Sequence, residues 1–159
     1  MSIQRETGCC PRFDPEAWEG KQVTWSHKLF VKDRVASVFH FPLNFGKVFR
    51  RNLEKIEPHK AMETPALVLS DENSLWGSDL YIAVTKDVPG AQMTVLSGTF
   101  CARVYEGPFQ NACHWQEHMV NQMKSEGRMV KKVYFFYTTC PKCAKAYGKN
   151  YVVVLAQVA

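Results

Sequence analysis

The stretch that decides the fold is DLYIAVTKDVPGAQMTVLSGTFCARVYEGPF, residues 79–109. Its first six residues form an apolar run typical of a buried strand. The Val88-Pro89-Gly90 segment that follows is a turn signal, and residues 93–105 then predict a second, longer strand. Because Glu106-Gly107-Pro108 breaks this strand, the sequence predicts a carboxylate at the point where the strand ends.

Further elements are expected on both sides of this stretch, and they follow one plan. Before it we expect a strand at 35–41, a helix at 44–57 and a strand at 66–70, and after it a helix from Asn111 to Gly127 and strands at 133–137 and 151–156. The order strand, helix, strand, strand therefore occurs twice. We predict an α+β fold made of two pseudo-repeated β-α-β-β units, with helices packed on one face of an antiparallel sheet.

The length of 159 residues suits a single domain, with the two units at 35–158. Residues 1–34 are expected to form an irregular N-terminal arm, because glycine and proline recur too often for a regular element over residues 8–20. The polar residues 71–73 are expected to form a turn.

The net charge of +5 is only mildly basic, and the lysines and arginines are scattered along the chain. The densest groups are Lys47, Arg50 and Arg51 on one predicted helix and Arg128, Lys131 and Lys132 before one strand. Neither group alternates with aromatic residues as a nucleic-acid platform does, so we expect solvated faces and no direct nucleic-acid partner.

The first seven residues lack the apolar core of a signal peptide, and no run approaches the length of a membrane span. We therefore expect a cytoplasmic protein with no membrane partner. Six cysteines in that compartment indicate packing, metal binding or thiol chemistry rather than a disulfide framework. No helix-turn-helix segment is visible before the domain, so it is not expected to be a transcription regulator by itself.

Within the stretch quoted above, four motifs carry a resemblance to a known family: residues 79–84, Val88-Pro89-Gly90, Ser97-Gly98-Thr99-Phe100 and residues 104–109. Together with the helix that follows, they resemble the second half of the GyrI-like small-molecule-binding superfamily. This fold is shared by the DNA gyrase inhibitor protein and by the bacterial-type effector-binding domains of multidrug regulators. In element order the resemblance extends from about residue 35 to residue 158.

The resemblance implies a central groove between the two halves that binds a small lipophilic, aromatic or cationic molecule. Some relatives hydrolyse small reactive compounds, so a hydrolase is the alternative that the resemblance leaves open. Glu106 is similar in position to the family's acidic residue, and Tyr81, Tyr105 and Trp115 stand where groove aromatics are found. Trp76 and Tyr137 are further candidates, since buried indole and phenol groups need hydrogen-bond partners that a ligand site provides.

Each of these residues also has a simpler interpretation. The aromatics are candidate core residues, and Glu106 is also compatible with an exposed acid in a turn. In the functional interpretation Glu106 supplies charge to a ligand or, in a hydrolase, activates water.

The pair Cys140 and Cys143 departs from the superfamily pattern, as does the arm that carries Cys9 and Cys10. Cys140 at the start of a short helix would favour a thiolate. Cys140 is therefore a candidate nucleophile and, after Glu106, the second candidate catalytic residue. Cys140 and Cys143 are also two of the four donors that a structural zinc site needs. No cofactor is expected, with zinc and a zinc-stabilised interaction protein as the open alternative.

The segment His114-Trp115-Gln116-Glu117-His118 matches the inverted zinc-peptidase signature. That site needs a third ligand downstream, and the chain contains no Asp or Glu after Glu126. We therefore expect a polar helix face rather than a peptidase. The sequence makes no statement about oligomeric state, the identity of the ligand, or turnover.

Overall fold

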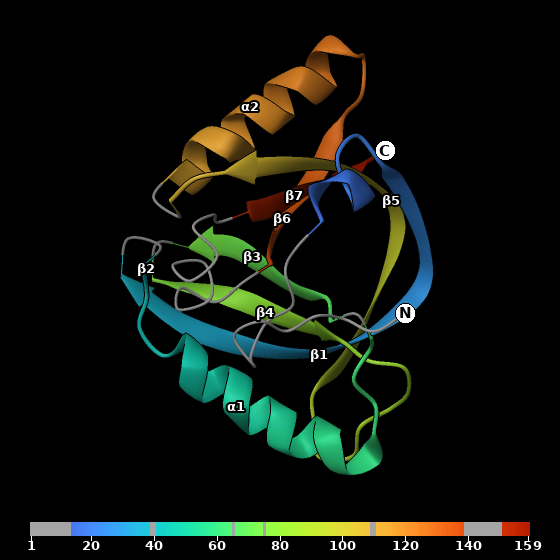
Figure 1. The fold of residues 1–159 in the computed structure, drawn as a ribbon, viewed down its shortest axis with the longest axis vertical. Coiled ribbons are helices and arrows are strands. Elements are labelled where there is room, and N and C mark those ends of the chain that lie inside the picture. The colour runs from blue at the N-terminus through green and yellow to red at the C-terminus, as the bar shows by residue number, and fades with distance from the viewer. Residues whose placement is uncertain (1–13, 39–40, 65, 75, 109–110, 139–150) are drawn as a thin grey trace. The chain divides into compact units, whose positions relative to one another are not determined.

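The computed structural model describes residues 14–38, 41–64, 66–74, 76–108, 111–138 and 151–159 (Figure 1). The elements in chain order are η1 (Pro15–Ala17), β1 (Gln22–Val38), β2 (Phe41–Pro42), α1 (Phe45–Ile56), η2 (Glu57–His59), β3 (Val68–Ser74), β4 (Gly77–Ala83), β5 (Met93–Glu106), α2 (Ala112–Ser125), β6 (Val130–Tyr137) and β7 (Tyr151–Val158). The chain forms two compact units: one is residues 25–98, and the other combines residues up to 24 with residues 99–159.

In the unit of residues 25–98, antiparallel strands follow the order β2-β1-β4-β3, and α1 covers one face (Figure 1). Val31 lies directly opposite Ile82 in the β1–β4 ladder, so both side chains lie on the same face. On α1, Val48 and Ile56 are fully buried and join these residues and Leu80 in one apolar cluster. The helical spacing of eight residues places both α1 side chains toward the sheet.

A polar network joins α1 to β1 inside the same unit. Asn52 is buried and donates to the Asp33 carboxylate at 2.7 Å and to the Val48 carbonyl at 2.8 Å. Arg51 binds the same carboxylate through two nitrogens at 2.7 and 2.8 Å. Asn44 precedes the helix, and its side-chain oxygen accepts the Ala36 amide at 2.8 Å. The bonds to Asp33 and the bond from Ala36 to Asn44 fix the helix on the strand, because each joins a group on β1 to a group on α1 or directly before it.

In the other unit, antiparallel β7 lies between β5 and β6, and α2 packs on β6 and β7 (Figure 1). Trp115, Met119 and Met123 recur every four residues on α2 and are all buried against the sheet. The segment before β1 runs alongside β5, where the Lys21 backbone carbonyl accepts a hydrogen bond from the Ala102 amide at 2.8 Å. This unit contains the strand end on which the candidate site is built.

The mixed helix and strand composition, the antiparallel pairing and both helices agree with the sequence prediction. The expected arm was wrong from Gln22 onward, because residues 22–34 belong to the long strand β1. The turn expected at 71–73 was also wrong, since β3 continues through these residues to Ser74. The pseudo-repeat and the groove between the halves stay predictions. Within the described residues, neither helix is long and apolar enough to cross a membrane.

Candidate functional site

The candidate site lies at the end of β5, where neighbouring side chains point to opposite faces of the sheet. Tyr105 pairs with Val152 and Glu106 pairs with Tyr151 on β7. Because side chains alternate along a strand, Tyr105 faces α2 and Glu106 faces away from it. Val152 belongs to the apolar cluster under α2, and Tyr105 packs against that cluster, which fixes the assignment of the two faces.

On the α2 face, Tyr105 is held between two side chains of the helix. Its ring stacks on Trp115 with centroids 5.8 Å apart and an interplanar angle of 23°. Its hydroxyl lies 2.7 Å from His118 Nδ1, and the imidazole stands edge-on to the phenol. Burial raises the pKa of the Tyr105 hydroxyl, while the positive charge of Arg103 opposes this rise. The raised pKa keeps the phenol neutral, and its hydroxyl shares a hydrogen bond with His118 Nδ1.

The residues on either side of this strand end are also held in place. Glu19 accepts the Val104 amide at 2.8 Å through one carboxylate oxygen, and its other oxygen lies 3.5 Å from Arg103 Nε. Gly107 has a φ of +144°, which side chains rarely tolerate. A Cβ at Gly107 would lie 3.3 Å from Asn111 Nδ2 and 3.4 Å from Trp115 Cζ2. The backbone thus turns at Gly107 against the start of α2.

On the opposite face, Glu106 is exposed at the strand end, whereas Phe136 and Val153 on the same face are buried. Phe136 on β6 pairs with Val153, which pairs with Val104 on β5, so these three side chains share the face of Glu106. Trp18 meets Phe136 edge to face, with centroids 5.6 Å apart. An exposed carboxylate at a strand end has the chemistry to attract a cation or to take a proton from water.

The predicted site residues of this unit are therefore divided between two faces. Tyr105, Trp115 and Tyr137 lie together on the α2 face, where Tyr137 stacks on Phe135 with centroids 6.1 Å apart. Glu106 lies on the other face. The sequence analysis did not single out Trp18 or Phe136, and it considered His118 only as part of a peptidase motif.

Tyr81 and Trp76 belong to the unit of residues 25–98. Tyr81 is buried on β4, where it meets Phe30 edge to face at 6.1 Å and has the Lys32 ammonium 5.6 Å from its ring centre. Trp76 is 61% exposed just before β4. A ligand role for Tyr81 or Trp76 stays a prediction.

The predicted thiol and metal residues Cys140 and Cys143 lie outside the described residues. Within the part of the chain that the structure describes, no three His, Cys, Asp or Glu side chains gather in a metal-binding arrangement. The exposed His114 and His118 lie one turn apart on α2, and His118 Nδ1 is engaged by Tyr105. Among the described cysteines, Cys101 is buried with Arg128 Nη1 3.1 Å from its sulfur.

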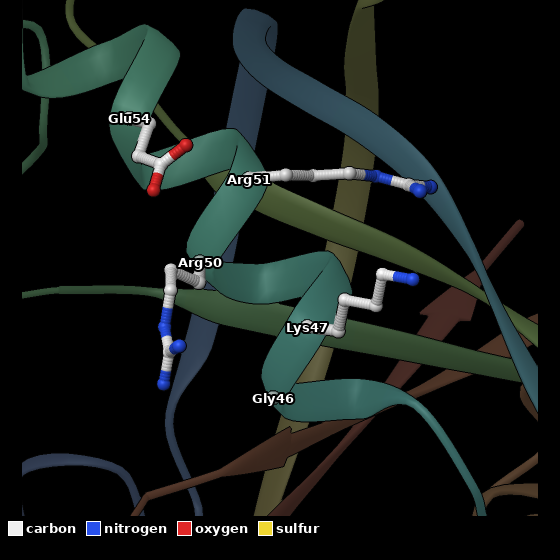
Figure 2. A pocket seen from close by; sticks show the side chains of 5 residues that line it. All are labelled: Gly46, Lys47, Arg50, Arg51 and Glu54. Carbon is white, nitrogen blue, oxygen red and sulfur yellow. The ribbon is translucent and has the colours of Figure 1, made fainter.

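The basic group on α1 lines a hollow together with Gly46 and Glu54 (Figure 2). In Figure 2, the Lys47 and Arg50 side chains point in different directions, and Arg51 is already paired with Asp33. The three cations of this group therefore do not point toward one common position. This is the arrangement expected of a solvated face.

Comparison with solved structures defines the class of fold. The chain is similar to the EcmrR C-terminal domain, with a TM-score of 0.63 at 9% identity, covering 89% of this chain and 98% of that one. A hydrolase from Listeria innocua gives a TM-score of 0.60 at 12% identity, covering 89% and 92%. SAV2435 bound to tetraphenylphosphonium gives 0.55 at 13% identity, covering 89% and 94%. At these identities the likeness establishes a shared α+β fold.

The family follows from the sequence. Residues 1–158 match the model of the family described as bacterial hydrolase, so the chain belongs to that family. No curated protein matches the sequence. EcmrR has also been solved in a complex with DNA, and the absence of a nucleic-acid partner here stays a prediction.

Proposed function

We propose that this protein binds a small lipophilic cation or aromatic molecule on the sheet face that carries Glu106. The observation that carries the proposal is the exposed Glu106 carboxylate at the end of β5, on the same face as Phe136. The half-buried Trp18 meets the buried Phe136 edge to face, so Trp18 is the ring of this pair that a ligand can reach. Aromatic surface favours transfer of an apolar ligand from water, and the carboxylate selects a positive charge.

The fold supports this proposal, since SAV2435 has a similar fold and was solved with tetraphenylphosphonium bound. The order of elements and the motifs at 79–109 also support membership of the GyrI-like superfamily. In the proposal, Tyr105, Trp115 and Tyr137 support the sheet from the α2 face. Trp76 and Tyr81 are kept as candidate ligand contacts.

Binding is tested by calorimetric titration with tetraphenylphosphonium and with triphenylphosphine oxide, an uncharged aromatic of comparable shape. We expect the cation to bind and Glu106→Gln to weaken its affinity about tenfold, because a paired charge contributes on the order of 1–2 kcal/mol at a partly exposed site. The control is Glu117→Gln, which removes one exposed carboxylate from α2 and should leave the affinity unchanged. Equal losses in the two variants would show that net charge, not this site, attracts the cation.

Hydrolysis of a small reactive compound is the second candidate function, and it is favoured by the family to which the chain belongs. Glu106 would act as general base by taking a proton from the attacking water. The rival nucleophile, Cys140, would form a covalent acyl intermediate instead.

The two mechanisms are separated by turnover of a panel of aryl esters. With Glu106 as base, Glu106→Gln lowers kcat at least about a hundredfold while the substrate still binds, and Cys140→Ser retains activity. With Cys140 as nucleophile, Cys140→Ser lowers kcat at least about a hundredfold and Glu106→Gln retains activity. Cys113→Ser is the matched thiol control, because Cys113 is exposed on α2. Absence of turnover in the wild-type protein across the panel would leave binding as the function.

A further inference from the structure

We propose that α2 is the positioning element for Glu106, acting through a clamp formed by Tyr105 and His118. This inference rests on the proposed role of Glu106 and adds the device that orients its carboxylate. Glu106 is the last residue of β5, where a strand has no further ladder pairs to hold it. The orientation of a side chain at the end of a strand therefore depends on how firmly the local backbone is held in place.

The first contact of the clamp is made directly before Glu106. The Tyr105 hydroxyl bonds to His118 Nδ1 at 2.7 Å, and the Tyr105 ring lies flat against Trp115. A phenol fixed at both its face and its hydroxyl has no alternative rotamer without losing one of these contacts. The rotation of the strand about its axis at Tyr105 is thereby set, and with it the direction in which Glu106 projects.

The second contact is made directly after Glu106, at Gly107. The closest neighbours of a Cβ at this position would be Asn111 and Trp115, so the chain passes tightly over the first turns of α2. Trp115 therefore stacks on Tyr105, the residue before Glu106, and its Cζ2 would lie 3.4 Å from a Cβ at Gly107, the residue after it. The Trp115 side chain thus lies close to both residues that flank Glu106.

A third contact holds the edge of the strand opposite β7. The Val104 amide donates to Glu19, whose carboxylate also approaches Arg103. Restraints on Val104, Tyr105 and Gly107 thus surround Glu106 on the chain, while Glu106 itself stays exposed on the opposite face. His118 takes no part in the apolar core under α2, so its place beside Tyr105 is explained by the hydrogen bond.

The test compares two variants that break the clamp with two that keep it. Tyr105→Phe keeps the stacking on Trp115 and removes the hydroxyl, and His118→Ala removes the hydrogen-bond partner of that hydroxyl. His118→Gln keeps a side chain that can form a hydrogen bond at a similar reach and is the rescue variant. His114→Ala removes an exposed histidine one turn earlier on the same helix and is the matched control.

Two readouts are followed for each variant: the affinity for tetraphenylphosphonium, and the NMR signals of the Glu106 amide and carboxyl without ligand. We expect Tyr105→Phe and His118→Ala to weaken binding about three- to tenfold, the range set by one net hydrogen bond. Both should also move the NMR signals of the Glu106 amide and carboxyl. His118→Gln and His114→Ala should match the wild type in both readouts.

The two levels of the proposal fail in different ways. If the Glu106 signals stay at their wild-type positions in both Tyr105→Phe and His118→Ala, α2 does not position this carboxylate, whatever the affinities. If those signals move but the wild-type protein binds no tetraphenylphosphonium, the clamp stands and the proposed ligand class is wrong. Circular dichroism of all four variants checks that the fold is retained.

Discussion

At the residue scale, Asp33 shows how a single carboxylate joins a helix to a strand. Hydrogen bonds from Arg51, followed by those from Asn52 and from the Arg34 amide, lower the pKa of Asp33 from 3.8 to about 2, against the opposing effect of burial. A carboxylate with a lowered pKa stabilises the folded state when it is ionised. Its contribution is present in full above the ordinary pKa of 3.8 and disappears as the pH falls through about 2.

The corresponding prediction concerns Asp33→Asn. We expect a loss of about 1 kcal/mol in the free energy of unfolding at pH 7, after allowing for the solvent that screens this pair. The difference from the wild type should shrink below pH 3.8 and be small by pH 2, because Asp33 becomes protonated as the pH falls through its folded-state pKa. Urea unfolding between pH 2 and pH 7 measures this, with the exposed Asp87→Asn as control. A difference that stays constant with pH would contradict the ionic role.

The same network marks a limit of sequence analysis at this scale. The sequence analysis predicted the helix at 44–57, on which Val48 and Ile56 are buried, and it named Trp115 as a candidate core residue, which is also buried. It did not identify Asn52, which is buried because Asp33 and the Val48 carbonyl satisfy its amide. A buried polar residue is explained by its partners, and these lie elsewhere in the chain.

At the element scale, the strand that was only partly predicted is β1. Val23 and Trp25 are half-buried between exposed neighbours, so the start of the strand does alternate. His27 then adopts a positive φ of 53°, and the alternation shifts so that Phe30 and Val31 are both buried. A pattern that changes phase in this way resembles an irregular segment, because its two halves do not share one period.

The end of β5 gives the opposite lesson at the same scale. The strand itself was predicted to within one residue, and alternation alone separates Tyr105 from Glu106. The resemblance to groove aromatics grouped these residues with Trp115 on one site. The contact of Tyr105 with His118 comes from packing of α2 on the sheet, which no local pattern contains.

At the scale of the whole molecule, β1 and β5 each contribute residues to both compact units. The chain passes from one unit to the other between residues 24 and 25, inside β1, and between residues 98 and 99, inside β5. The residues at which the chain passes between the units therefore belong to strands β1 and β5. Loss of structure in one unit removes the ladder partners that keep these strands extended, so we infer that the units unfold together.

This inference is tested with Val48→Ala, which opens a cavity under α1 in the unit of residues 25–98. We expect a loss of about 2 kcal/mol in the free energy of unfolding. If unfolding is one cooperative event, hydrogen-exchange protection of the β6 and β7 amides in the other unit should fall by the same free energy. Val95→Ala is the matched control, since Val95 is 45% exposed on β5. Protection of β6 and β7 that stays at the wild-type level while α1 exchanges faster would show that the shared strands do not couple the two units.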